Sequence, residues 1–391
     1  MRNLILRPVR AGLARRLTGL RDDGGRGAIG VLVAVMIGAG VLFGMGALVV
    51  DVGQIFENRA ELQNGADAAA LAVAKSCAQG TCTPSIATTY AGDNASKLTG
   101  GKANVNLVCG VNGTAGVGTG SCLVVPKVCP ANPPAGANYV DVETSTLLPS
   151  GSHLLPPVFA GTLAGSHSGS TVYACSQAEW GGPLTSTSIG FTISACTWDE
   201  ATGVADPKTG KPTGNQPVFA AQPPYNTTNP DPSLKSLDQV VYAKGGPTQK
   251  VCTSEPNGAD APGNFGWTSK SNCSVLISAG IYPGSTGNSG AGDCQPLLAA
   301  WRTNQTVLDV PVYTSVAGSG NGASFTLKGF AAFVITGYSL PGFSANDWVT
   351  GKAPCNGGAW CISGFFTHEL VDTSGTLGGT NLGLTIIKLT G

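Results

Sequence analysis

The feature that most constrains this chain is an apolar run of 23 residues, 28–50, which holds no charged or strongly polar side chain. As a helix it would be about 34 Å long, which is enough to cross a hydrocarbon core about 30 Å thick. The preceding residues carry seven Arg and two acidic side chains, and such a basic flank stays in the cytoplasm. The sequence therefore predicts a basic cytoplasmic tail (1–27) and a transmembrane helix (28–50). It further predicts a single-pass protein of the cytoplasmic membrane, with the lipid bilayer as a partner and an extracytoplasmic body.

A cleaved signal peptide is the alternative for this run. Signal peptides have an apolar region of about 7–15 residues, closely followed by a cleavage site of small residues. Here the apolar run is longer, and the nearest A-x-A sites, such as Ala70-Leu71-Ala72, lie deep in a helical pattern. These differences favour a retained anchor.

The cysteines agree with an extracytoplasmic body. All twelve follow the apolar run, and an even number in an oxidising compartment predicts disulfides. The closest spacings are Cys77 to Cys82 and Cys355 to Cys361, which suit small local loops. No C-x-x-C pair occurs, so a zinc site is not expected. The pairing of the other cysteines stays open.

The helix is predicted to continue beyond the apolar run as an extended helix over 51–76. This segment has no Pro and carries a stripe of apolar residues at heptad-like spacing. The stripe consists of Val52, Ile55, Leu62, Ala66, Ala69 and Val73. After Cys77 the sequence turns rich in Gly, Thr, Ser and Pro, with short alternating segments typical of strands. The predicted fold is one transmembrane helix continuing into an amphipathic helix, followed by disulfide-bearing β-rich (α+β) domains at 77–185 and 186–391. The second domain contains a Pro-rich loop at 205–234.

Charge and motifs argue against several functions. Charged residues make up 11% of the chain and the formal net charge is zero, so the body has no electrostatic footprint for nucleic acid. The Gly-rich stretch 318–322 lacks the Lys-Ser/Thr of a nucleotide-binding loop. His368-Glu369 lacks the second His, four residues after the first, of a zinc-protease helix. We therefore expect no enzyme activity, no metal and no cofactor. Gly40 and Gly44 give the apolar helix a small-residue face on which another helix could pack.

A motif follows the apolar run. It comprises Asp51-Val52-Gly53, then Arg59, then Leu62-Gln63, and finally Asp67-Ala68-Ala69-Ala70-Leu71-Ala72. Together with the basic tail and the apolar helix, this pattern resembles the N-terminal module of Flp pilus-assembly TadE/TadG-like proteins, over residues 26–74. A weaker similarity lies near 306–338.

The resemblance implies a membrane-anchored structural or assembly component of a Flp-type (tight adherence) pilus or a related surface system. Its partners would be other pilus-assembly membrane proteins or pilin-like helices. Processed pilin-like members carry a Gly followed a few residues later by Glu, whereas no Glu follows Gly27 or Gly30 here. This difference argues against cleavage by a prepilin peptidase. The alternative function is a cell-surface binding module, adhesin-like, for a glycan or protein ligand. It would use the loops at 205–234 and 284–293.

Overall fold

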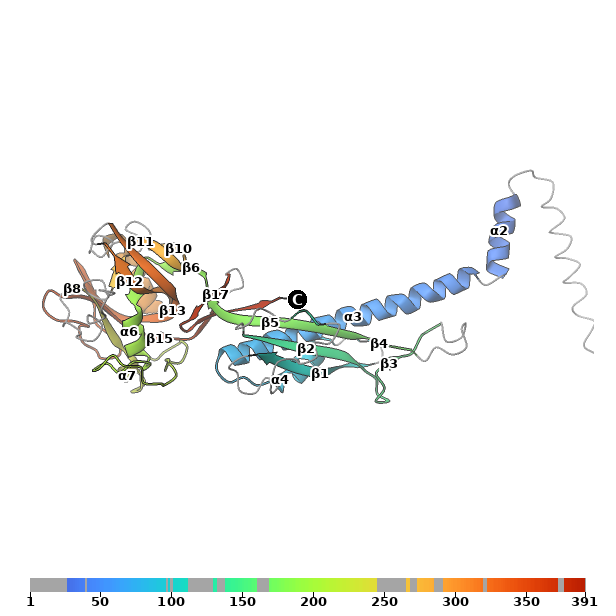
Figure 1. Ribbon diagram of the computed structural model, residues 1–391, viewed down its shortest axis with the longest axis horizontal. Coiled ribbons are helices and arrows are strands. Elements are labelled where there is room, and N and C mark those ends of the chain that lie inside the picture. Colours follow the sequence, from blue (N-terminus) through green and yellow to red (C-terminus); the bar gives the residue numbers. More distant parts are fainter. Residues whose placement is uncertain are drawn as a thin grey trace, which may run out of the picture. The chain divides into compact units, whose positions relative to one another are not determined.

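The computed structural model of the chain (Figure 1) describes residues 27–38, 41–95, 98, 101–111, 129–131, 138–159, 169–244, 265–267, 273–284, 291–318, 322–371 and 376–390. The chain divides into two compact units. Unit 1 comprises 1–66, 88–106 and 143–175, and unit 2 comprises 67–87, 107–142 and 176–391. The boundaries expected at 77–185 and 186–391 stay predictions.

The N-terminal helices correct the sequence analysis. The apolar run is divided between α2 (Gly27–Gly38) and α3 (Val41–Ala78), because α2 ends at glycine, a poor helix former. The 12 residues of α2 span about 18 Å, short of the roughly 30 Å that a membrane requires. The apolar start of α3 ends at Asp51. Within the described part of the chain, no helix is long and apolar enough to cross a membrane. The prediction of a transmembrane helix over 28–50 is therefore wrong.

Unit 1 is built around the first part of α3. It also contains α4 (Ile86–Asn94), β3 (Leu154–Leu155), β4 (Ser170–Thr171) and parts of β1 (Lys102–Val111) and β2 (Asn138–Leu147). Leu62 and Ala66 of α3 are fully buried, and the hydroxyl of Thr144 in β2 donates to the Leu62 carbonyl oxygen at 3.1 Å. The amphipathic pattern expected for 51–76 thus places Leu62 and Ala66 in a core, while Val52 stays exposed.

Unit 2 is β-rich, as expected, and its longest strand is β13 (Ala323–Leu340). This strand pairs with β12 (Val307–Ala317) in an antiparallel hairpin. The main core packs against these strands, with Phe333 and Phe366 in ring contact at 5.1 Å. Trp198 joins this core and donates from its indole N–H to the Leu382 carbonyl oxygen at 3.1 Å.

The remaining strands are short. Those before β12 are β5 (Tyr173–Pro183), β6 (Thr185–Ile189), β7 (Phe191–Ser194), β8 (Gln239–Lys244), β9 (Phe265–Trp267), β10 (Ser274–Ser278) and β11 (Gly280–Gly284). Those after β13 are β14 (Phe343–Ala345), β15 (Trp360–Thr367), β16 (Glu369–Val371), β17 (Leu377–Asn381) and β18 (Leu384–Leu389). Three helices accompany them: α6 (Ala195–Ala201), α7 (Leu234–Leu237) and α8 (Ala291–Asn304).

Disulfides are present. Cys77 bonds to Cys82, and Cys355 bonds to Cys361, so both local pairs singled out by their spacing are bridged. A third bond joins Cys273 to Cys294, and this one links the start of β10 to α8. The spacing of 21 residues gave no sign of that pairing.

Candidate functional site

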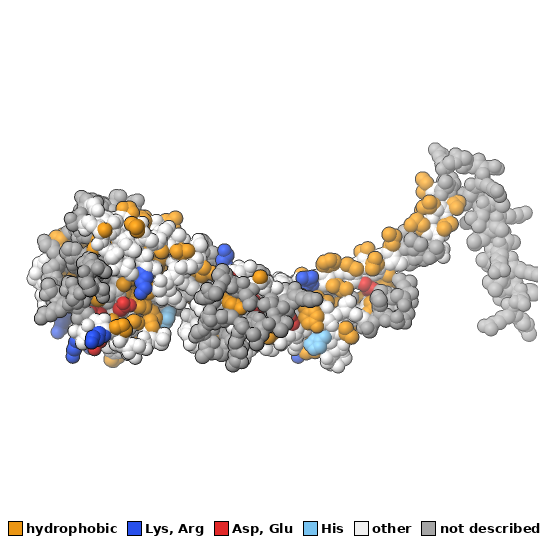
Figure 2. Space-filling view, viewed as in Figure 1, with side chains coloured by type: hydrophobic (Ala, Val, Ile, Leu, Met, Phe, Trp, Pro, Cys, Tyr) orange, Lys and Arg blue, Asp and Glu red, His pale blue; other side chains and the backbone are white. Residues whose placement is uncertain are grey.

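An apolar face of α3 lies uncovered in unit 1. Met45, Leu48, Val49, Val52 and Phe56 are exposed by 61%, 61%, 71%, 40% and 66%. Their spacing places all five within a stripe about 100° wide on the helix surface. Figure 2 shows hydrophobic side chains along this helix. We call these five residues the α3 stripe.

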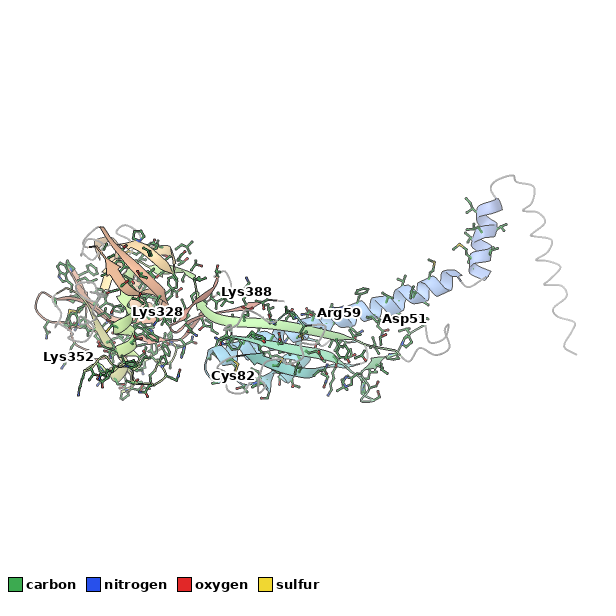
Figure 3. All side chains as sticks on the ribbon, in the orientation of Figure 1. Asp51, Arg59, Cys82, Lys328, Lys352 and Lys388 are labelled. Carbon is green, nitrogen blue, oxygen red and sulfur yellow. A yellow bond between two sulfur atoms is a disulfide. The ribbon has the colours of Figure 1, made fainter. Side chains whose placement is uncertain are left out.

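The opposite face of the same helix segment holds it on unit 1. Ala47, Asp51, Asn58 and Leu62 are buried there. Asp51 is 8% exposed, and its Oδ1 accepts the backbone N–H of Val158 at 2.7 Å and of Phe159 at 3.1 Å. Two N–H donors satisfy the carboxylate, so its burial is tolerated. Asp51 therefore ties the segment after β3 to α3 (Figure 3).

A small apolar groove adjoins the α3 stripe. It has a volume of about 160 Å³ and lies between α3 and the segments of β3 and β4. Leu48 and Val52 of the stripe line it, together with Leu155, Pro156 and Pro157. Stripe and groove thus form one continuous apolar surface on unit 1, suited to receiving the side chains of an apolar partner.

The other motif residues divide between the surface and the core. Leu62, Ala69 and Ala70 are fully buried, and the Gln63 amide donates to the Cys175 carbonyl oxygen at 3.0 Å. The remaining positions are less covered: Gly53 and Arg59 are exposed, and Asp67 and Leu71 are half-buried. Gly44 has open space around it, while Gly40 lies outside the described residues. Most of the motif therefore builds the fold of α3.

The motif and the second part of the apolar run belong to one continuous helix, Val41–Ala78. Residues 27–76 match the family described as "Putative Flp pilus-assembly TadE/G-like". The match covers α2 and nearly all of α3, so this N-terminal segment is similar to TadE/G-like proteins, and the similarity associates the chain with Flp pilus assembly. No curated protein and no solved structure matches the chain.

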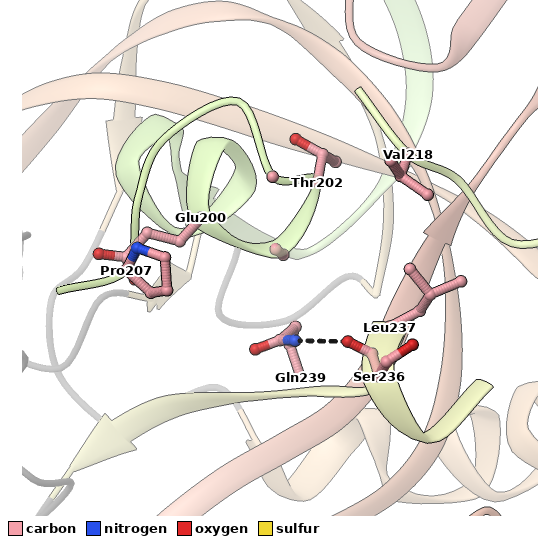
Figure 4. Close-up of a pocket in the computed structure, with 9 residues that line it drawn as sticks. Glu200, Thr202, Pro207, Val218, Ser236, Leu237 and Gln239 are labelled. Atoms are coloured by element: carbon pink, nitrogen blue, oxygen red, sulfur yellow. Dashed lines mark hydrogen bonds between the residues drawn. The ribbon is translucent and has the colours of Figure 1, made fainter. Parts of the chain in front are cut away.

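Unit 2 contains a separate open cleft beyond the segment that is similar to TadE/G-like proteins. The cleft has a volume of about 580 Å³ and lies between the end of α6, the following loop and the α7–β8 segment (Figure 4). Pro207 and Val218, both from the Pro-rich loop at 205–234, contribute to its wall. Glu200 is its one acidic lining residue, and Ser236 and Gln239 add polar groups.

Unit 2 also buries carboxyl groups. Burial and contact with Asp347 raise the pKa of Asp238 to about 8, while the Thr336 hydroxyl donates to its Oδ1 at 2.7 Å. Burial, with the nearby charge of Asp309, raises the pKa of Glu369 to about 7. The rings of His368 and Phe219 are in tilted contact, with centroids 4.1 Å apart, and burial lowers the pKa of His368.

These groups do not form a metal site. Over the described residues, no three His, Cys, Asp or Glu side chains gather where a metal ion would bind. The expectations of no enzyme activity and no cofactor stay untested.

Sequence analysis missed two features of the site. It assigned Met45, Leu48 and Val49 to lipid, whereas they form an uncovered face of a helix whose other side packs on unit 1. It also gave Asp51 no partner, because Val158 lies 107 residues further along the chain. The carboxylate after an apolar run was the one available signal, since a buried Asp must find donors.

Proposed function

We propose that this protein is a non-catalytic assembly component of a Flp-type pilus. In this proposal, the α3 stripe docks on an apolar helix of another pilus-assembly protein. The family match to residues 27–76 supports a role in pilus assembly. The observation that carries the docking step is the uncovered apolar face of α3 beside its groove.

The spacing of the stripe fits a helical partner. Met45, Val49, Val52 and Phe56 follow one another at intervals of four, three and four residues. This alternation is the heptad pattern by which two helices interlock side chains. An apolar surface of this kind, left uncovered, is a mark of an interaction site.

The disulfides support a place of action outside the cytoplasm. The bonds Cys77–Cys82, Cys273–Cys294 and Cys355–Cys361 belong to oxidising compartments, since cytoplasmic reductants keep thiols reduced.

The test is co-purification of the full chain from cells that carry the pilus system, followed by identification of the bound pilus-assembly proteins. The double variant Val49→Ser, Phe56→Ser should lose a pilus-assembly partner that the unaltered chain retains. Ile281→Ser is the matched control, because Ile281 is 80% exposed but lies in unit 2. Equal recovery of the partner by the double variant would refute docking through the stripe.

The cleft of unit 2 favours a second candidate function, a surface-binding module for a glycan or protein ligand. Its support is that Pro207 and Val218 of the Pro-rich loop help line a cleft large enough for a small ligand. Screening the full chain on glycan and peptide arrays tests this candidate. Binding that is lost in Gln239→Ala would support it, and binding unaffected by that change would place the ligand elsewhere.

A further inference from the structure

Three polar side chains from neighbouring strands meet in unit 2. Asp141 belongs to β2, Gln177 belongs to β5, and Thr390 directly follows β18. The Gln177 amide nitrogen donates to Asp141 Oδ1 at 2.9 Å. The Thr390 hydroxyl donates to Gln177 Oε1 at 3.0 Å. The carboxamide of Gln177 therefore has an acid at its nitrogen and a hydroxyl at its oxygen.

Strand pairing fixes this arrangement. β5 is a sheet neighbour of β2 and pairs antiparallel with β18. Leu389 lies opposite Ala178, so Thr390 comes opposite Gln177, and its N–H donates to the Gln177 carbonyl oxygen at 3.0 Å. Side chains directly opposite on paired strands stand about 5 Å apart at Cβ. Strand pairing thus keeps the Thr390 hydroxyl next to the Gln177 carboxamide.

Two of these three side chains are buried. Asp141 is fully buried and Gln177 is 2% exposed. Burial raises the pKa of Asp141 to about 6, so this carboxyl carries a proton far more often at neutral pH than an ordinary aspartate. Thr390 is exposed at the rim, which leaves a small released molecule a way out.

We propose that Thr390 and Gln177 become joined by an intramolecular ester bond formed by the protein itself. The hydroxyl oxygen of Thr390 adds to Cδ of Gln177, and its proton passes to Oε1. Protonated Asp141 gives its proton to Nε2, the Cδ–Nε2 bond breaks and ammonia leaves. The proton on Oε1 then returns to the Asp141 carboxylate. The reaction consumes no other reagent and occurs once per molecule, with Thr390 as nucleophile and Asp141 as general acid.

The geometry favours such a step. The Thr390 hydroxyl lies 3.0 Å from Oε1 of the carboxamide whose carbon it would attack, so the two reacting groups are already next to each other in the fold. The acid contacts the leaving nitrogen directly. Gln177 also donates to the Ala131 carbonyl oxygen at 3.3 Å, and this second contact orients the amide.

Intact mass of the purified full chain, denatured and reduced, tests the proposal. The bond removes one ammonia, so the measured mass should fall about 17 Da below the mass of the sequence. A digest should contain one joined species that holds Gln177 and Thr390. Treatment with mild base should separate it into two peptides, with Glu at position 177. A full mass and two separate peptides in the untreated folded protein would overturn the proposal.

Variants separate this bond from other losses of ammonia, such as cyclisation at Asn-Gly sequences. Thr390→Ala and Asp141→Asn should both restore the full mass, because one lacks the nucleophile and the other lacks the proton donor. Thr390→Ser is the matched control, which keeps the hydroxyl and should keep the deficit. Circular dichroism confirms that each variant is folded. A deficit that persists in folded Thr390→Ala would assign it to another site and refute the proposal.

Discussion

At the scale of single residues, Asp51 shows how a buried charge shapes unit 1. Its carboxylate accepts two backbone N–H groups from the segment after β3. Hydrogen bonds to a charged group contribute about 1.5–3 kcal/mol each when their partner is removed from a buried site. The position of Val158 and Phe159 beside α3 therefore depends on this side chain.

Asp51→Ala should destabilise unit 1 by about 2 kcal/mol, because the N–H groups of Val158 and Phe159 lose their acceptor in a segment that is about half exposed. Chemical denaturation followed by hydrogen exchange at Val158 and Phe159 measures the loss. Glu57→Ala is the control, since Glu57 is exposed on the same helix and its removal should change stability by less than about 0.5 kcal/mol. Equal stability of the two variants would contradict the assigned role of Asp51.

Asp238 predicts a dependence of stability on pH. In the folded chain the Asp238 carboxyl group stays protonated up to a pH of about 8, whereas in the unfolded chain it loses its proton near pH 4. The folded state therefore binds more protons between these values, and its stability falls as the pH rises through this window.

Asp238→Asn should reduce the loss of folding stability between pH 5 and pH 8.5 by at least about 1 kcal/mol. Urea midpoints at the two pH values provide the measurement. Asp206→Asn serves as the control, because Asp206 lies in the Pro-rich loop and is only half-buried. If Asp238→Asn keeps the full pH dependence of the unaltered chain, the proton is not held at this site.

At the scale of elements, α3 combines loose and tight packing along one helix. A Cβ at Gly65 would lie 2.8 Å from the Ala91 carbonyl oxygen, whereas one at Gly53 would meet nothing within 4 Å. Gly65 therefore lets α4 approach α3, and Gly53 has no such role.

Two alanine substitutions should consequently act in opposite directions. Gly65→Ala should destabilise by about 1–3 kcal/mol through overpacking, while Gly53→Ala should stabilise by up to about 1 kcal/mol through helix propensity. Thermal unfolding of both variants checks the pair. A stabilising Gly65→Ala would mean that α3 and α4 are not in close contact.

The elements also show how far sequence reasoning reaches. The helix over 51–76 and the β-rich character of the chain after Cys77 follow from local patterns, so they were predicted. The short strand β3 was not predicted, because two residues followed by Pro156 and Pro157 carry no alternating pattern. Helix α8 was missed, since it contains Pro296 and follows a Gly-rich stretch.

The candidate sites were harder to predict than the elements. Asp141, Gln177 and Thr390 are spread over more than two hundred positions, and strand pairing alone brings them together. No spacing in the sequence signals such a meeting. The α3 stripe was visible as an apolar pattern, but part of it was assigned to lipid because the length of the apolar run suggested a membrane helix.

At the scale of the whole molecule, the proposed ester bond would close a loop of 213 residues. Chain-entropy reasoning assigns a cross-link over such a loop about 5 kcal/mol of stabilisation. Thr390→Ala should therefore unfold at a clearly lower urea concentration than Thr390→Ser, which keeps the bond. Equal urea midpoints would show that the two unfolded chains do not differ by a cross-link.

The pairing of β18 with β5 also bears on when unit 2 can fold. Residues 178–181 are synthesised some two hundred positions before their partners at 386–389, so this pairing must wait until nearly all of the described chain has been made. The hairpin of β12 and β13 needs only a short connection, and its closure costs little entropy. Order of synthesis thus predicts that the hairpin forms early and that β18 is the last strand to join. Pairing of β18 with β5 would then complete the folding of unit 2.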